Sequence, residues 1–98
     1  MKRYNVAFSP EAKEDVKAIQ RYLRQFSPKA PVRFGEAMRE KLDTVKENPH
    51  MYEQYRYQPR YRCIPIEKYL LFYEADDEQK VIYVFRVLHG AQNMPDFL

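Results

Sequence analysis

The sequence has little glycine, a single cysteine and no tryptophan: two Gly, one Cys and no Trp among 98 residues. A lone Cys63 excludes an internal disulfide framework and a cysteine zinc cluster, so a reducing cytoplasm is the expected compartment. Cys63 itself is expected to be a small core residue. No apolar run is long enough to span a bilayer and no signal peptide is recognisable, so neither secretion nor a membrane location is expected. The length indicates one folded domain over residues 1–98.

Positive charge is concentrated locally. The net charge is +3 and the isoelectric point is near 9, a mild bias toward polyanionic partners. Arg56, Arg60 and Arg62 crowd one short stretch, with only Glu53 nearby as an acidic residue. No group of His, Cys or carboxylates has the spacing of a metal site, and there is no glycine-rich phosphate loop. We therefore expect neither a metal nor a cofactor.

The first half of the sequence predicts a strand followed by two helices. Apolar residues alternate over residues 3–8, as in a strand. Ser9 is suited to cap a helix and Pro10 to begin it. Residues 27–31 separate the two helices, and Pro49 ends the second. Apolar residues at helical spacing form two stripes: Ala12, Val16, Ile19, Leu23 and Phe26, then Phe34, Met38, Leu42 and Val45.

The second half predicts three strands. Residues 61–66, 69–75 and 80–88 are rich in β-branched and aromatic side chains, and their short connections require antiparallel pairing. Residues 50–60 read as a polar and aromatic loop. The order β-α-α-β-β-β predicts an α+β fold, with a helical hairpin packed on one face of a small, mostly antiparallel twisted sheet. The other face of the sheet is then open for function.

Two arginines interrupt these apolar strands. Strand alternation puts Arg62 on one face with Ile64 and Ile66, and Arg86 on one face with Ile82, Val84 and Leu88. Because a buried arginine without a partner is costly, we expect Arg62 and Arg86 on the open face or its rim. There they would form an anion-binding pair within reach of one phosphate. His89, three residues after Arg86, joins them only if the strand bends near Gly90.

Simpler interpretations stand beside this one. Arg86 could pair with Glu74 on the neighbouring strand, and His89 could cap a strand end by bonding to the backbone. Arg56 and Arg60 could be solvated loop charges. His50, beside Pro49, fits a solvated turn.

The segments "FSPEAKEDVKAIQRYL", "YRCIPIEKYLLFYEADDEQKVIYVFRVLHG" and "AQNMPDFL", in this order of elements, resemble the RelE/ParE superfamily of bacterial toxins over nearly the whole chain. The resemblance implies the toxin of a type II toxin–antitoxin module, held inactive by a small cognate antitoxin. RelE-like members cleave mRNA on the ribosome without a metal, using the 2′-hydroxyl of the RNA. ParE-like members lack the nuclease residues and poison DNA gyrase.

The resemblance implies roles for named residues. Arg62 and Arg86 match strand arginines near the scissile phosphate, where cations stabilise the developing charge, and His89 is the candidate acid. Arg56 and Arg60, with the aromatic rings of Tyr55, Tyr57 and Tyr61, would bind RNA; the two arginines could instead contact an acidic antitoxin segment.

The ribosome-dependent endoribonuclease is the first choice on the sequence. The ending "RVLHGAQNMPDFL" is closer to the ParE type, so a gyrase poison without nuclease activity is the alternative. A third possibility, from another class, is an inactive module that only binds the antitoxin. In each case the antitoxin would lay a helix, or a helix and a strand, over the sheet edge and the apolar faces of the hairpin.

Overall fold

A computed structural model describes residues 3–90 of the chain. The elements are β1 (Asn5–Phe8), α1 (Pro10–Arg24), α2 (Lys29–Glu47), β2 (Gln54–Tyr55), β3 (Gln58–Ile66), β4 (Tyr69–Asp76) and β5 (Val81–His89). The predicted α+β class and element order are confirmed, with one strand more than expected. The short β2 and the start of β3 lie in the segment 50–60, which had been predicted as loop.

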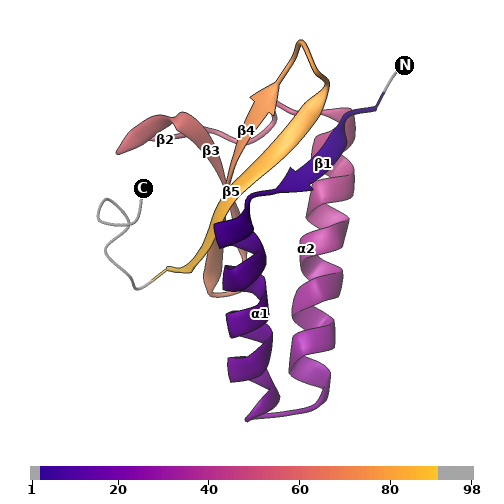
Figure 1. The fold of residues 1–98 in the computed structure, drawn as a ribbon, viewed down its shortest axis with the longest axis vertical. Coiled ribbons are helices and arrows are strands. Elements are labelled where there is room, and N and C mark those ends of the chain that lie inside the picture. The colour runs from indigo at the N-terminus through magenta and orange to yellow at the C-terminus, as the bar shows by residue number, and fades with distance from the viewer. Residues whose placement is uncertain (1–2, 91–98) are drawn as a thin grey trace.

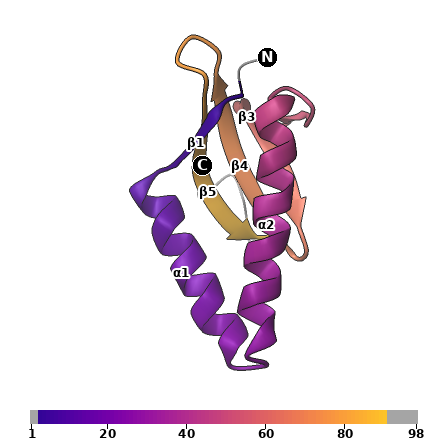
Figure 2. The ribbon, with the colours of Figure 1, turned by 90° about the vertical axis from the view of Figure 1, so that its right-hand side faces the viewer.

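The five strands form one mixed sheet in the order β1-β5-β4-β3-β2. β1 runs parallel to β5, and the other neighbours are antiparallel. The two helices run side by side in opposite directions and cover one face of the sheet (Figures 1 and 2). The helical hairpin on one face is therefore as predicted.

The helix boundaries follow from local chemistry. The Ser9 hydroxyl accepts a hydrogen bond from Ala12 N at 2.9 Å and caps α1, which begins at Pro10 as predicted. α2 begins at Lys29, earlier than expected, and includes Pro31. A proline is tolerated there because the first-turn N–H groups have no partner within the helix.

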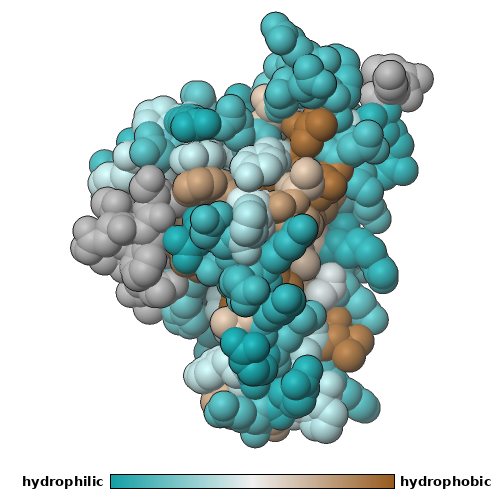
Figure 3. Space-filling model, in the orientation of Figure 1, coloured by the Kyte–Doolittle hydropathy of each residue, from teal (hydrophilic) through white to brown (hydrophobic). Residues whose placement is uncertain are grey.

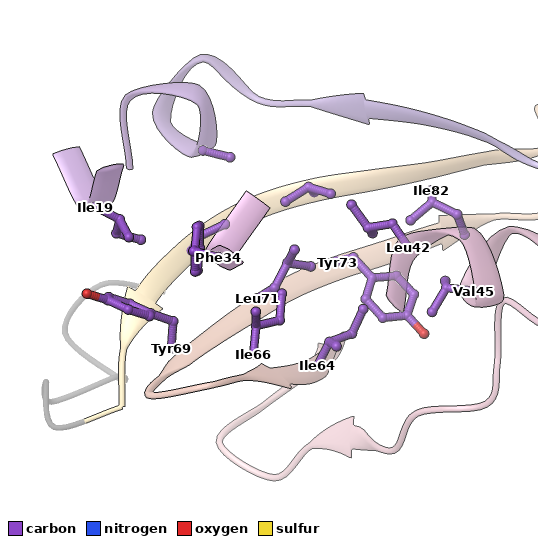
Figure 4. Packing of buried hydrophobic residues seen from close by; sticks show 13 residues of the cluster. Ile19, Phe34, Leu42, Val45, Ile64, Ile66, Tyr69, Leu71, Tyr73 and Ile82 are labelled. Carbon is purple, nitrogen blue, oxygen red and sulfur yellow. The ribbon is translucent and has the colours of Figure 1, made fainter. Parts of the chain in front are cut away.

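The main core lies between the helices and the sheet. Figure 4 shows Phe34, Leu42 and Val45 of α2 directed toward side chains of β3 and β4. Phe26 does not belong to this core, contrary to the predicted stripe, since it follows the end of α1 and is 69% exposed. A second cluster covers the opposite face of the sheet, built on Tyr61, Phe72 and Leu88. The open face is therefore lined with aromatic rings.

Candidate functional site

A register shift in β5 changes the faces predicted for its C-terminal half. Tyr73 of β4 pairs with Val84, whereas the preceding Phe72 pairs with Arg86, so β5 contains one extra residue there. As a result Val87 belongs to the helix-side core and Leu88 to the opposite cluster. The prediction that Arg86 and Leu88 share a face with Ile82 and Val84 is wrong, because a bulge of this kind reverses the alternation between Val84 and Arg86.

Arg86 is held by a carboxylate of α1. Its Nε donates to Asp15 Oδ2 at 2.7 Å and its Nη2 donates to Asp15 Oδ1 at 3.0 Å. The two side chains are only 21% and 15% exposed. The hydrogen bond to Asp15 raises the pKa of Arg86. The possible pairing of Arg86 with Glu74 is wrong, because Glu74 accepts from Arg60 Nε at 2.8 Å.

Asp15 also completes the edge of β5. β1 pairs with β5 only as far as Val84. Beyond that point Ser9 Oγ donates to Phe85 O at 2.6 Å, and Val87 N donates to Asp15 Oδ2 at 3.0 Å. The start of α1 therefore takes the place of β1. Sequence reasoning missed this role, although an acid spaced with the apolar Ala12 and Ile19 on one helical face was a usable signal.

Arg62 lies on the helix-facing side of the sheet, at the end of the core. It shares that face with Ile64 and Ile66, as the alternation predicted, and both isoleucines are fully buried under the helices. Its Nη1 donates to Tyr52 O at 2.6 Å and, at 3.4 Å, to His50 O. The expected position on the open face is wrong, because the segment after α2 supplies carbonyl partners on the covered side.

The two arginines are not brought together as an anion-binding pair. Arg62 on β3 lies beside Tyr73 and binds the segment after α2, whereas Arg86 on β5 lies beside Phe72 and binds α1. β4 separates their strands. The expectation that both guanidinium groups reach a single phosphate is therefore wrong in this structure, since each has been used to fasten a different segment to the sheet.

His89 and Arg86 do share a cavity. It has a volume of about 340 Å³ and lies between α1 and the end of β5, lined by Asp15, Tyr22, Tyr69, Arg86 and His89 among others. The ring of His89 packs edge-on against Tyr69, with centroids 5.3 Å apart. A second cavity of about 690 Å³ shares Tyr22, Tyr69 and His89 and extends to the start of α2. The pairing of β5 with β4 is regular from Arg86 to His89, so the two side chains reach the cavity from a regular stretch of strand and not through the bulge.

The residues proposed to contact RNA gather around the β2–β3 hairpin. The guanidinium of Arg56 lies 5.1 Å from the Tyr57 ring centroid, and that of Arg60 lies 5.5 Å from the Tyr61 ring centroid. Tyr61 is buried and stacks on Phe85 at 4.6 Å, whereas Tyr57 is 60% exposed. Tyr55 packs edge-on against Tyr57 and Phe72. The cluster is thus a cationic and aromatic surface, and its rings contact Phe85, which precedes Arg86 in β5, and Phe72, which pairs with Arg86.

His50 is more than a solvated turn residue. Its Nε2 lies 3.1 Å from both carboxylate oxygens of Asp77, which also accepts from the Tyr4 hydroxyl at 2.7 Å. The hydrogen bond from Tyr4 lowers the pKa of Asp77, and His50 lowers it further. This group ties β1, the segment after α2 and the β4–β5 turn together. Arg62 holds the same segment through its carbonyls.

Cys63 behaves as a small apolar residue. It packs against the cluster built on Tyr61, Phe72 and Leu88 on the open face, and burial raises the pKa of its thiol to about 11. A thiol with such a pKa is protonated at neutral pH and is a poor nucleophile. Within residues 3–90 no three His, Cys, Asp or Glu side chains gather as metal ligands. Across the same residues, no helix is long and apolar enough to cross a membrane.

Solved structures show which proteins share this fold. The chromosomal ParDE system of P. aeruginosa matches with a TM-score of 0.70 and 15% identity, over 89% of this chain and 96% of that one. The intact E. coli RelBE toxin–antitoxin complex matches with a TM-score of 0.63 and 23% identity, over 91% and 99%. A mutant of the E. coli toxin RelE, in complex with an antitoxin RelBc peptide, matches with a TM-score of 0.66 and 22% identity, over 97% and 90%.

At these identities the structural likeness establishes the fold alone, and the family is established by a match to a family model. A search of curated protein sequences finds no match. The family model of the ParE toxin of the type II toxin–antitoxin system, parDE, matches residues 6–94 and so covers most of the sequence. Together with the fold, this match shows that the chain belongs to the ParE toxin family of type II toxin–antitoxin systems, within the RelE/ParE superfamily.

Proposed function

We propose that this toxin arrests growth by poisoning DNA gyrase and that it does not cleave mRNA. The observation that carries the proposal is the use of Arg62 and Arg86 to fasten the fold. Metal-free RNA cleavage requires cations positioned at the phosphate where negative charge develops. The Arg86 guanidinium is bonded to both carboxylate oxygens of Asp15, and these hydrogen bonds must break before it can bind a phosphate.

The family match supports the same choice between targets. The matched family is that of ParE, and the resemblance noted for the sequence implies that ParE-like members act on gyrase. The ending of the chain, "RVLHGAQNMPDFL", also favours that branch. It has an arginine, a valine-leucine-histidine run and a short final segment. Both gyrase and its DNA are cytoplasmic in bacteria, so the toxin would act in the cytoplasm.

A second candidate, ribosome-dependent cleavage of mRNA, is favoured by one observation. Arg56 and Arg60 lie over tyrosine rings on the β2–β3 hairpin, an arrangement suited to stacking on RNA bases. Under this candidate Arg86 and His89, which line one cavity, would supply the cation and the acid, and Arg62 would move to the phosphate. It requires the Asp15–Arg86 pair to open on RNA binding, which makes it the weaker of the two.

The cognate antitoxin is the third part of the proposal. Intact RelBE and the RelE–RelBc complex are solved toxin–antitoxin assemblies with this fold. We propose that this chain likewise forms a stable complex with the small protein encoded beside it, and that the complex is not toxic. An inactive module would form the same complex but would not arrest growth when expressed alone.

Expression in cells separates these candidates. The toxin produced alone should arrest growth, induce DNA-damage signalling and leave translated messages intact by primer extension. Production together with the neighbouring small protein should restore growth. New 5′ ends inside translated messages would establish the nuclease and refute the gyrase proposal, and unimpeded growth at high expression would leave only the inactive module.

A further inference from the structure

The end of the helical hairpin carries charge of one sign only. We define the helical tip as residues 21–33, which include the last turn of α1 and the first turn of α2. These residues contain no Asp or Glu. The four cations among them are all exposed: Arg21, Arg24, Lys29 and Arg33. Since the net charge of the whole chain is only +3, its positive charge is concentrated at the helical tip.

Two of these cations are unfavourable for the helix that carries them. Lys29 and Arg33 are four residues apart on α2, a spacing at which like charges repel each other. The first turn of α2 contains no acidic residue, although the positive end of a helix dipole favours acids there. Within residues 3–90, none of the four cations of the helical tip forms an ion pair. Their charges are therefore available to a partner.

The helical tip also exposes apolar side chains. Figures 1 and 2 show that it projects beyond the sheet, and Figure 3 shows mainly hydrophilic residues on this end, at the bottom of the view. Among them Phe26, Val32 and Tyr22 are 69%, 60% and 53% exposed. The rings of Tyr22 and Phe26 pack edge-on, with centroids 5.1 Å apart. Exposed aromatic rings beside arginines are typical of surfaces that bind nucleic acid.

Arg33 lines two cavities at the helical tip. The larger, of about 690 Å³, also has Phe26 and Lys68 in its wall, and the smaller, of about 520 Å³, has Lys29 and Val32. Each cavity has one acidic residue in its wall. Cations and apolar side chains therefore lie side by side, as the binding of a phosphate next to a base requires.

DNA fits this surface better than an acidic protein does. The centres of protein interfaces are depleted of charged residues, whereas a DNA duplex carries one negative charge for about every 1.7 Å of its axis. Arginine binds phosphate through two parallel hydrogen bonds. An interrupted duplex also exposes base faces, on which an aromatic ring such as that of Phe26 stacks. An intact duplex hides these faces.

We infer that the helical tip binds DNA at the break made by gyrase, with its four cations on the phosphates and Phe26 against an exposed base. The inference rests on the proposed function in taking gyrase-bound DNA as the ligand. A ligand shifts an equilibrium only toward the state that it binds more tightly. Tighter binding to broken than to intact DNA therefore increases the fraction of gyrase complexes that hold cleaved DNA, which is what poisoning requires.

Fluorescence anisotropy of labelled DNA tests the binding without gyrase. The probes are an intact duplex and the same duplex with a central gap. The native toxin should bind both, and the gapped duplex more tightly. Phe26→Ala should abolish the preference for the gap and leave the salt dependence unchanged. Failure to bind either DNA would overturn the inference, and tighter binding to RNA of the same sequence would overturn it by identifying RNA as the ligand.

The double variant Arg24→Ala with Arg33→Ala tests the cations. We expect it to weaken DNA binding by about tenfold or more, and to reduce the slope of log affinity against log salt concentration by about two. The control, Lys13→Ala with Lys17→Ala, removes an equal charge from the first half of α1. Equal losses in the two variants would reduce the effect to net charge and overturn the inference. All four residues are exposed, and thermal melting checks that each variant is folded.

The gyrase cleavage reaction separates this inference from the proposed function. The Arg24 and Arg33 variant should trap less cleaved DNA than the control variant. Equal trapping by the two would overturn the inference while gyrase poisoning stands. A toxin that prefers gapped DNA but traps no cleaved DNA would refute gyrase poisoning and support the DNA-binding surface. If the variant loses binding to gyrase alone and keeps its affinity for DNA, the helical tip is a protein interface and the inference is wrong.

Discussion

Two arginine–carboxylate pairs in this protein have the same chemistry and different surroundings. The side chains of Arg86 and Asp15 are 21% and 15% exposed, whereas those of Arg60 and Glu74 are 67% and 38% exposed. The first pair joins α1 to β5 and also receives Val87 N. The second joins two strands in solvent, where water and salt screen the attraction. Loss of one partner from the first pair leaves a poorly solvated charge or an unsatisfied donor.

The comparison separates cations that hold the fold from cations that are available to a partner. Arg62, like Arg86, is bonded to groups of a distant segment. Arg56 and Arg60 instead lie over tyrosine rings on the β2–β3 hairpin. We therefore expect substitutions in the first group to reduce stability, and substitutions in the second to affect function without unfolding the protein.

The largest expected effect is that of Asp15→Ala. It removes the carboxylate that accepts two hydrogen bonds from Arg86 and one from Val87 N, which we expect to lower the free energy of unfolding by about 2–4 kcal/mol. Urea denaturation of toxin purified from its antitoxin complex measures this. Glu74→Ala is the matched control and should produce no comparable loss. Similar losses in the two variants would remove the distinction between the pairs.

Arg62→Ala should have the next largest effect. It removes the donor shared by Tyr52 O and His50 O, and we expect a loss of about 1–2 kcal/mol, since hydrogen bonds from charged donors are among the stronger ones. The amides of the segment after α2 should also exchange faster. Arg56→Ala, which removes an equal charge from the surface, is the control. A melting temperature for Arg62→Ala equal to that of Arg56→Ala would show that Arg62 is not a structural residue.

The exposed arginines should matter for toxicity and not for folding. We expect the double variant Arg56→Ala with Arg60→Ala to inhibit growth less than the native toxin while its urea midpoint stays nearly unchanged. The control removes two positive charges from α1 by Lys13→Ala with Lys17→Ala. Equal toxicity of the two double variants would exclude a role for the hairpin beyond its contribution to net charge.

The smallest expected effect depends on pH. The folded state lowers the pKa of Asp77 below 3.8, first through the Tyr4 hydroxyl. A lowered carboxyl pKa adds stability above the unfolded value, and this stability is lost as the pH falls through the folded value. The difference in melting temperature between native toxin and Asp77→Asn should therefore be present at neutral pH and disappear well below pH 3.8. A difference that persists unchanged in acid would assign the effect to packing.

Much of the fold could be predicted because local signals agreed with one another. Ser9 and Pro10 marked the start of the first helix, and the stripe through Phe34, Leu42 and Val45 marked the buried face of the second. These features depend on residues close together in the sequence. Short β2 was missed because its two residues carry no alternation of their own.

The site could not be predicted to the same extent, because it depends on contacts between distant residues. Alternation in β5 failed at Arg86, where one extra residue opposite Phe72 reverses the faces. The role of Asp15 was not predicted: its position on the apolar face of the helix indicates a partner, but does not reveal that the partner is an arginine 71 residues later. The sequence did identify Arg62 and Arg86 as unusual strand residues that need partners. It could not show that the partners are groups of this protein.

Incubation of purified toxin with gyrase, supercoiled DNA and ATP tests the central claim most directly. Linear DNA trapped on gyrase should be measured by electrophoresis after detergent and protease treatment. We expect linear DNA to accumulate with toxin and to disappear when the antitoxin is added first. No accumulation with toxin that arrests growth in cells, together with cleaved messages in a translation reaction, would contradict the assignment to gyrase.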